Sequence, residues 1–116
     1  MTTNCSNTNR CPCMEHCPLE KTLKLIGGKW KIIIICSLYN DGPTRYNELR
    51  RRIKGITNTM LASSLKELEK DGLIIRKQFN EMPVRVEYSL TDIGENLLPI
   101  LSQLANWGNQ VKWVDK

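Results

Sequence analysis

Cysteine is the residue type in this sequence with the most chemistry to offer, and four of the five cysteines lie within the first seventeen residues. Cys17 is followed by Pro18 and Glu20, a pattern typical of a helix start in which a thiol takes the usual place of a hydroxyl. The unpaired N–H groups and the dipole of a helix N-terminus stabilise a thiolate. Cys17 is therefore predicted to be a redox-sensing thiol. The cysteines available to form a disulfide with it, from the same arm or from a partner subunit, are Cys5, Cys11 and Cys13.

The same segment has two other interpretations. Cys11, Cys13, His16 and Cys17 supply three thiols and an imidazole within seven residues, a donor set that suits tetrahedral zinc or a soft monovalent metal. Their spacing is not the usual Cys-x-x-Cys pair, and the adjacency of His16 and Cys17 is awkward for one closed site. The third interpretation is an arm whose thiols have no regulated chemistry. The redox interpretation is our prediction, with metal binding as the alternative and no bound cofactor expected.

The fifth cysteine differs from the others. Cys36 lies beside the apolar run from Ile32 to Ile35 and is predicted to be a core residue. An odd number of cysteines argues against a structural disulfide framework.

A second chemical group lies on one face of a predicted helix that Thr57 caps and that ends near residues 71–72. At 100° per residue, Leu61, Leu65 and Leu68 form an apolar stripe, and the opposite face carries small polar and basic side chains. Such a helix reads base edges in the major groove with its N-terminal half. The residues predicted to contact bases are Asn58, Thr59, Ser63 and Lys66, with Lys66 the best candidate for guanine.

The positive charge of the chain is concentrated around this helix. The formal net charge is +5, and residues 43–85 carry ten basic and five acidic side chains, whereas the rest of the chain is neutral. This distribution is expected of a face that meets a polyanion. The residues predicted to contact DNA phosphates are Arg45, Arg50, Arg51, Lys54 and Lys70. Those predicted to reach the flanking backbone or the minor groove from a β-hairpin are Arg76, Lys77 and Arg85.

The predicted elements place these side chains in a winged helix-turn-helix fold, mainly α with a small β-hairpin wing. A polar arm at 1–16 precedes a domain at 17–116. A helix opens at Cys17 and ends at Gly27-Gly28, and a second runs from about Lys29 to residues 40–43. The second helix is predicted to place on one face Trp30, Ile33, Ile34 and Leu38. A short helix with Tyr46, Leu49 and Ile53 follows, and the turn Gly55-Ile56 leads from it to the helix capped by Thr57. The chain then continues with strands at 74–80 and 84–90 and with a last helix, which Thr91 caps.

The last helix carries an apolar stripe with alternating steps of four and three residues, which is long for a terminal helix on a small domain. Pro99 lies within it and is expected to kink it. Such stripes favour pairing with a partner helix, so a homodimer is predicted through the first and last helices. The residues predicted at this interface are Leu19, Leu23, Leu97, Leu101, Leu104 and Val111.

Length and composition exclude other classes. A chain of 116 residues with 41% hydrophobic and 25% charged residues is typical of one globular domain. The longest apolar run, Ile32 to Cys36, is too short to span a membrane, and the first residues lack a signal-peptide pattern, so a cytoplasmic protein is expected. With one histidine, no nucleophile elbow and no phosphate-binding glycine loop, the sequence does not suggest an enzyme.

Several motifs together resemble the HxlR-type winged helix-turn-helix regulators, bacterial relatives of the MarR group. The residues that carry the resemblance are Cys17-Pro18-Leu19-Glu20, Ile26-Gly27-Gly28-Lys29-Trp30, Tyr46-Asn47-Glu48-Leu49, Gly55-Ile56-Thr57, Met60-Leu61, residues 65–73, residues 83–91, Leu97-Leu98-Pro99 and Trp107-Gly108. The resemblance implies a dimeric DNA-binding regulator whose first and last helices form the dimer interface. Several members sense electrophiles, quinones or oxidants through the cysteine that opens the first helix, here Cys17.

These observations lead to one prediction and two alternatives. The prediction is a homodimeric bacterial transcriptional regulator, a repressor, that binds a pseudo-palindromic operator in double-stranded DNA and is switched by a small electrophile or oxidant at Cys17. One alternative is a metal-responsive regulator that uses Cys11, Cys13, His16 and Cys17. The other is a winged-helix protein-interaction or RNA-binding module without sequence-specific DNA binding.

Overall fold

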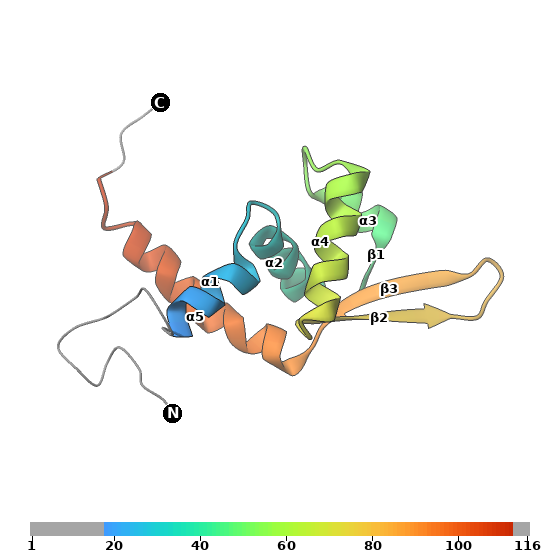
Figure 1. The fold of residues 1–116 in the computed structure, drawn as a ribbon. Helices are drawn as coiled ribbons and strands as arrows, with labels where there is room; N and C mark the ends of the chain where they lie inside the picture. Colours follow the sequence, from blue (N-terminus) through green and yellow to red (C-terminus); the bar gives the residue numbers. More distant parts are fainter. Residues whose placement is uncertain (1–17, 113–116) are drawn as a thin grey trace.

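The computed structural model describes residues 18–112 and confirms a winged helix-turn-helix with five helices and a small antiparallel sheet (Figure 1). The elements in chain order are α1 (Pro18–Ile26), α2 (Lys31–Asp41), β1 (Thr44–Arg45), α3 (Tyr46–Arg52), α4 (Asn58–Lys70), β2 (Ile74–Phe79), β3 (Arg85–Leu90) and α5 (Asp92–Gly108). The two long strands agree with the predicted ranges to within one residue. In Figure 1 the β2–β3 hairpin extends from one end of the molecule, and α1 and α5 lie at the other end.

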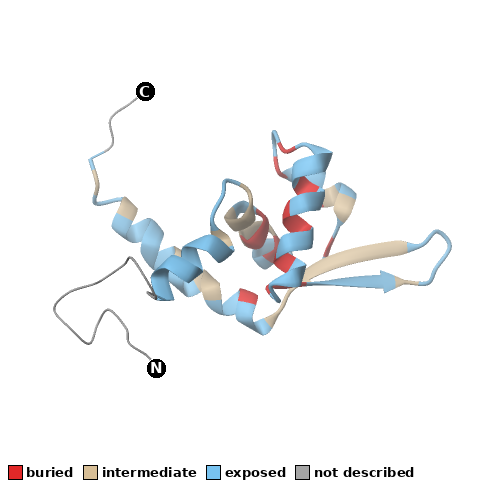
Figure 2. Cartoon of the chain, in the orientation of Figure 1, coloured by how far each residue is buried: buried red, intermediate tan, exposed pale blue. Residues whose placement is uncertain are grey.

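One hydrophobic core holds the helix-turn-helix together. Ile34, Ile35 and Leu38 of α2 pack with Leu49 of α3, the leucine stripe of α4 and Ile74 of β2, and the buried colour in Figure 2 is concentrated in these central elements. The predicted stripe of Leu61, Leu65 and Leu68 is confirmed, because each of these side chains is at most 2% exposed.

The predicted apolar face of α2 is wrong in part. Ile33 is 41% exposed and Ile35 is fully buried in its place. A run of consecutive isoleucines satisfies several helical faces equally well, so its period cannot choose among them. The helix also begins at Lys31 rather than Lys29, with Trp30 at the N-cap position. Cys36, predicted to be a core residue, is only half-buried, and burial raises the pKa of its thiol.

The sheet contains a strand that the sequence did not reveal. Its order is β1-β3-β2, and β1 pairs Thr44 with Tyr88 and Arg45 with Glu87. Two residues are too few to show a strand period, and this strand exists because β3 lies beside it. The pairing joins the start of α3 to the wing, so the two parts of the molecule are fixed relative to each other.

The two predicted N-caps are confirmed. The Thr57 hydroxyl accepts a hydrogen bond from Met60 N at 3.1 Å, and the Thr91 hydroxyl accepts one from Gly94 N at 3.1 Å. The Thr91 hydroxyl also donates to the Gly72 carbonyl at 2.7 Å. Thr91 therefore both starts α5 and attaches it to the turn between α4 and β2.

The outer helices contribute little to this core. Within residues 18–112, α1 has no buried residue and Gly94 is the only buried residue of α5. Leu19, Leu23 and Leu104 are about half exposed, whereas Leu97 and Leu101 are half-buried. Val111 lies beyond the end of α5 at Gly108, so the predicted helical stripe is shorter than expected. Pro99 lies inside the helix, and no helix among the described residues is long and apolar enough to cross a membrane.

Gly94 provides the first test of this architecture. A methyl group at this position would lie 2.3 Å from the Leu73 carbonyl oxygen, which itself accepts a hydrogen bond from Thr91 N. A glycine-to-alanine change inside a helix ordinarily stabilises it by about 1 kcal/mol. We expect Gly94→Ala to have the opposite sign and to lower the free energy of unfolding by about 2 kcal/mol in urea denaturation, because backbone atoms must separate. Ser102→Ala, on the exposed side of α5, is the matched control, and equal effects would contradict the close approach.

Candidate nucleic-acid interface

The exposed face of α4 is the centre of the candidate interface. The predicted base-contacting residues Asn58, Thr59, Ser63 and Lys66 are all exposed, as is Lys70 in the last turn. They project away from the core because the leucine stripe on the opposite side is buried against α2, α3 and β2. The structure therefore presents Thr59, Ser63, Lys66 and Lys70 as one row of small polar and basic side chains along a helix whose rotation is fixed, whereas Asn58, at the start of the helix, lies about 60° from Leu61 and outside this row.

Tyr46 positions the start of α4, a role that the sequence analysis missed. Its hydroxyl donates to the Asn58 carbonyl oxygen at 3.1 Å and lies 3.3 Å from the Asn58 side-chain oxygen. The sequence showed Tyr46 only as part of an apolar stripe, and this contact joins residues twelve positions apart. The bond ties the first turn of α3 to the first turn of α4, where base contacts are expected.

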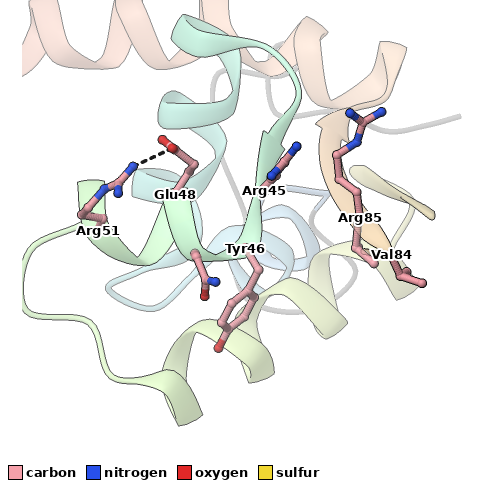
Figure 3. Close-up of a pocket in the computed structure, with 8 residues that line it drawn as sticks. Arg45, Tyr46, Glu48, Arg51, Val84 and Arg85 are labelled. Carbon is pink, nitrogen blue, oxygen red and sulfur yellow. Dashed lines mark hydrogen bonds and ion pairs between the residues drawn. The ribbon is translucent and has the colours of Figure 1, made fainter. Parts of the chain in front are cut away.

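A cavity of about 340 Å³ lies between the start of α3 and the wing (Figure 3). It is lined by Arg45, Tyr46, Asn47, Glu48, Arg51, Val84, Arg85 and Val86. Three arginines are among the lining residues, and an arginine can bind a phosphate group with a fork of parallel N–H donors. It brings together two residues predicted for the DNA backbone, Arg45 and Arg51, and one predicted for the wing, Arg85.

These arginines differ in how far their charge is already neutralised. Arg51 pairs with Glu48 at 2.5 Å, the bond that is dashed in Figure 3, and Arg52 bridges Glu48 and Asp41. The hydrogen bond and charge of Arg51, with Arg52 and Arg45 nearby, hold the pKa of the Glu48 carboxyl below its usual value. Among residues 18–112, Arg45 pairs with no carboxylate, and it is exposed. Arg45 is therefore the arginine of this cavity whose charge is not offset by an ion pair among the described residues, and we call this an uncommitted charge.

The wing uses one of its basic residues for its own structure. The Arg85 guanidinium lies 4.0 Å from the centre of the Phe79 ring and pairs with Glu81 at 3.2 Å and Glu87 at 3.4 Å. Arg76 and Lys77 on β2 are exposed, and the Lys77 ammonium is 5.2 Å from the centre of the same ring. The contact of Arg85 with the Phe79 ring joins the two strands of the hairpin, whereas the ion pairs of Arg85 lie within β3 and the turn before it.

The remaining predicted residues divide into two groups. Arg50 and Lys54 are exposed near the end of α3 but do not line the cavity. The predicted thiol and metal ligands, Cys5, Cys11, Cys13, His16 and Cys17, lie outside the described residues. Among the described residues the first helix spans Pro18–Ile26.

Comparison with known proteins identifies a matching family model and similar relatives. Residues 25–116 match the family model described as HxlR-like helix-turn-helix. The chain is 53% identical over 95 residues to an uncharacterised HTH-type transcriptional regulator of Halalkalibacterium halodurans, which covers 82% of this chain and 84% of the relative. It is 46% identical over 98 residues to the uncharacterised HTH-type transcriptional regulator YdeP of Bacillus subtilis, covering 84% of this chain and 76% of YdeP.

Solved structures give the same result. The redox regulator HypR in its oxidised form superimposes with a TM-score of 0.74 at 46% identity, covering 84% of this chain and 100% of HypR. The reduced form of the transcriptional regulator YodB from B. subtilis superimposes with a TM-score of 0.76 at 38% identity, covering 81% of this chain and 92% of YodB.

The unequal pairing of the arginines predicts unequal effects on salt dependence. Each phosphate that the protein neutralises adds about 0.9 to the slope of log affinity against log salt concentration. We expect Arg45→Ala to reduce the magnitude of this slope on duplex DNA by about one unit per protomer. Arg51→Ala should reduce it by clearly less, because Glu48 already offsets the charge of Arg51. Titrations at several salt concentrations measure both slopes, and equal reductions would contradict the assignment of Arg45 as the uncommitted charge.

Proposed function

This chain belongs to the HxlR-like helix-turn-helix family and is a transcriptional regulator of that type, and on this premise we propose that it is a homodimeric repressor with a thiol switch. It binds a pseudo-palindromic operator in double-stranded DNA with one α4 helix per half-site. A small electrophile or oxidant that modifies Cys17 releases the DNA. The alternative functions are a metal-responsive regulator and a protein-interaction or RNA-binding module.

The observation that carries DNA binding is the face of α4. Thr59, Ser63, Lys66 and Lys70 are exposed opposite three buried leucines, so the helix can enter a groove without disturbing the core. Two such helices related by a two-fold axis reach major grooves about one helical turn apart. Tyr46, which lines the cavity between α3 and the wing, also hydrogen-bonds to the first residue of α4, so the cavity is linked to this helix. Arg45, which lines the same cavity, is proposed to bind a backbone phosphate.

The exposed apolar side chains of the outer helices support the homodimer. Leu19 and Leu23 on α1 and Leu104 on α5 are about half exposed, and Ile93 and Ile100 on α5 are exposed even further. Burial of such side chains contributes roughly 2 kcal/mol each, so a second copy that covers them gains substantial stability. The predicted interface residues Leu97, Leu101 and Val111 are half-buried, and Leu97 lines one depression together with Ile93 and Ile100.

The thiol switch is supported by the position of Cys17 and by two of the similar proteins. In the sequence, Cys17 directly precedes Pro18, the first described residue of α1, and the unpaired N–H groups of a helix N-terminus stabilise a thiolate. HypR is described as a redox regulator, and YodB is known in a diamide-treated form as well as a reduced one. In the proposed switch two thiols lose two protons and two electrons to the oxidant and become one disulfide, and the movement of α1 alters the spacing of the two α4 helices.

Substitution of Lys66 tests whether α4 contacts the bases of the DNA. The reduced protein selects duplexes from a randomised pool, and fluorescence anisotropy then compares the selected duplex with a scrambled one. We expect Lys66→Ala to weaken binding to the selected duplex about tenfold or more and to reduce the preference for it, since one base contact is worth about 1–3 kcal/mol. Lys112→Ala removes the same charge beyond α5 and should have little effect. Failure of the parent protein to prefer any sequence would favour the interaction-module alternative.

Cys17 is tested by its response to an oxidant. We expect a mild thiol oxidant to weaken binding of the parent protein to the selected duplex at least tenfold, which corresponds to about 1.4 kcal/mol of coupling. Cys17→Ser should bind the duplex but not respond. Cys36→Ser, whose native thiol is half-buried with a raised pKa, should respond like the parent. An equal response of Cys17→Ser and the parent would contradict the switch, and one tightly held zinc equivalent would favour the metal-responsive alternative.

A further inference from the structure

One ammonium group connects three helices of this protein. Lys31 Nζ lies 2.7 Å from Glu67 Oε1 on α4 and donates to the Leu25 carbonyl oxygen on α1 at 3.3 Å. The Lys31 side chain is only 12% exposed. Lys31 is also the first residue of α2, where a positive charge is unfavourable because the N-terminus of a helix carries the positive end of its dipole. The position therefore requires partners outside α2, and Leu25 and Glu67 are those partners.

The bond to Leu25 makes use of the end of α1. The last four carbonyl groups of a helix have no partner within the helix, and Leu25 is one of these residues in α1. Cations near a helix C-terminus are stabilised by the dipole as well as by the hydrogen bond. The Lys31 ammonium thus donates to a carbonyl group at the end of α1, and its remaining N–H groups are available to Glu67 on α4.

Glu67 is located where a free negative charge would harm DNA binding. It follows Ser63 by one turn, about 40° around the helix from it, and it is adjacent to Lys66. Ser63, Lys66 and Glu67 line one depression on the outer surface of α4. The Glu67 carboxylate is 57% exposed. The hydrogen bond and charge of Lys31, followed by the charge of Lys70, lower the pKa of this carboxyl, so Glu67 carries its charge at neutral pH.

A second depression shows how closely the end of α1 approaches this surface. The turn between α1 and α2 faces α4 across a cavity of about 290 Å³, to which Gly28, Lys31, Ser63 and Glu67 all contribute. The predicted base-contacting residue Ser63 therefore shares one cavity wall with both members of the ion pair. A change in the ion pair is a change at the edge of the DNA-reading face.

We propose that Lys31 is a positioning residue for DNA recognition, whose ammonium group neutralises Glu67 and holds it beside the α1–α2 turn, away from the DNA phosphates. Without this partner, the carboxylate is free to turn toward the phosphates and repel them. The same ammonium group couples the position of α1 to α4. A shift of α1 that moves the Leu25 carbonyl away removes one of the two contacts that hold the ammonium in place, and the other contact is with Glu67 of α4. This role rests on the proposed function of α4 in binding DNA.

A double-mutant cycle on the full chain tests the role of Lys31. Lys31→Met keeps the aliphatic stem and removes the charge, and Glu67→Gln removes the charge that Lys31 is proposed to neutralise. Anisotropy titrations with the selected duplex compare the parent, each single variant and the double variant. We expect Lys31→Met to weaken binding about tenfold when Glu67 is present and by less than about threefold when Glu67→Gln is present. Glu67→Gln alone should bind at least as tightly as the parent.

Two controls separate this role from a loss of charge or of structure. Lys29→Met removes a positive charge from the same turn, but the Lys29 ammonium lies over the Trp30 ring at 4.8 Å, so this variant should bind nearly as the parent does. Thermal unfolding of all variants checks folding, and a merely structural role of Lys31 would give the same loss of affinity with or without Glu67. That equal loss would overturn the proposed role of Lys31 alone. A parent protein with no preference for any duplex would overturn the proposed function and the role of Lys31 with it.

Discussion

Burial of the leucine stripe of α4 is the interaction on which the rest of the structure depends. Leu61, Leu65 and Leu68 are removed from water by α2, α3 and β2. Full burial of each leucine contributes roughly 2 kcal/mol, and rotating the helix by one residue would move most of this stripe out of the core. The rotation of α4 is therefore fixed without any contribution from its outer face. The side chains of Thr59, Ser63 and Lys66 are exposed and are not part of the core, so these positions can be selected for binding.

The core that fixes α4 leaves the outer helices dependent on other contacts. α5 is attached to the helix-turn-helix through Thr91 and through the close approach of Gly94 to Leu73, and α1 is attached through Lys31. Besides these polar and backbone contacts, Ile26 of α1 and Leu97 and Leu98 of α5, all half-buried, pack against the edge of the core. The exposed leucines of α1 and α5 are thus available to a second copy, and the elements proposed for dimerisation are distinct from those proposed for DNA reading. Any signal between the two regions has to pass through these few attachments.

Local patterns predicted most of the elements, because caps, turns and helical periods depend on neighbouring residues. Thr57 and Thr91 start helices where the sequence places them, and the buried face of α4 follows from its period. Contacts between distant residues were not predictable in this way. The bond from Tyr46 to Asn58 and the pairing of β1 with β3 exist only once the chain has folded. The ion pair of Lys31 with Glu67 has the same origin, since thirty-five residues separate its members and neither shows a local signal.

The charge count of the sequence overstates the charge that is free to meet DNA, and the ion pairs show why. Arg51 is 71% exposed and its pair with Glu48 is worth at most about 1 kcal/mol, so a phosphate could take the place of the carboxylate. That exchange would leave Glu48 without Arg51 near a polyanion, so it would gain little net attraction. Arg85 is only 26% exposed and is stacked on Phe79, so moving it would disrupt the wing itself. The three arginines therefore differ in role: Arg45 is exposed and forms no ion pair among the described residues, whereas the ion pairs of Arg51 and Arg85 shape the surface proposed to bind DNA.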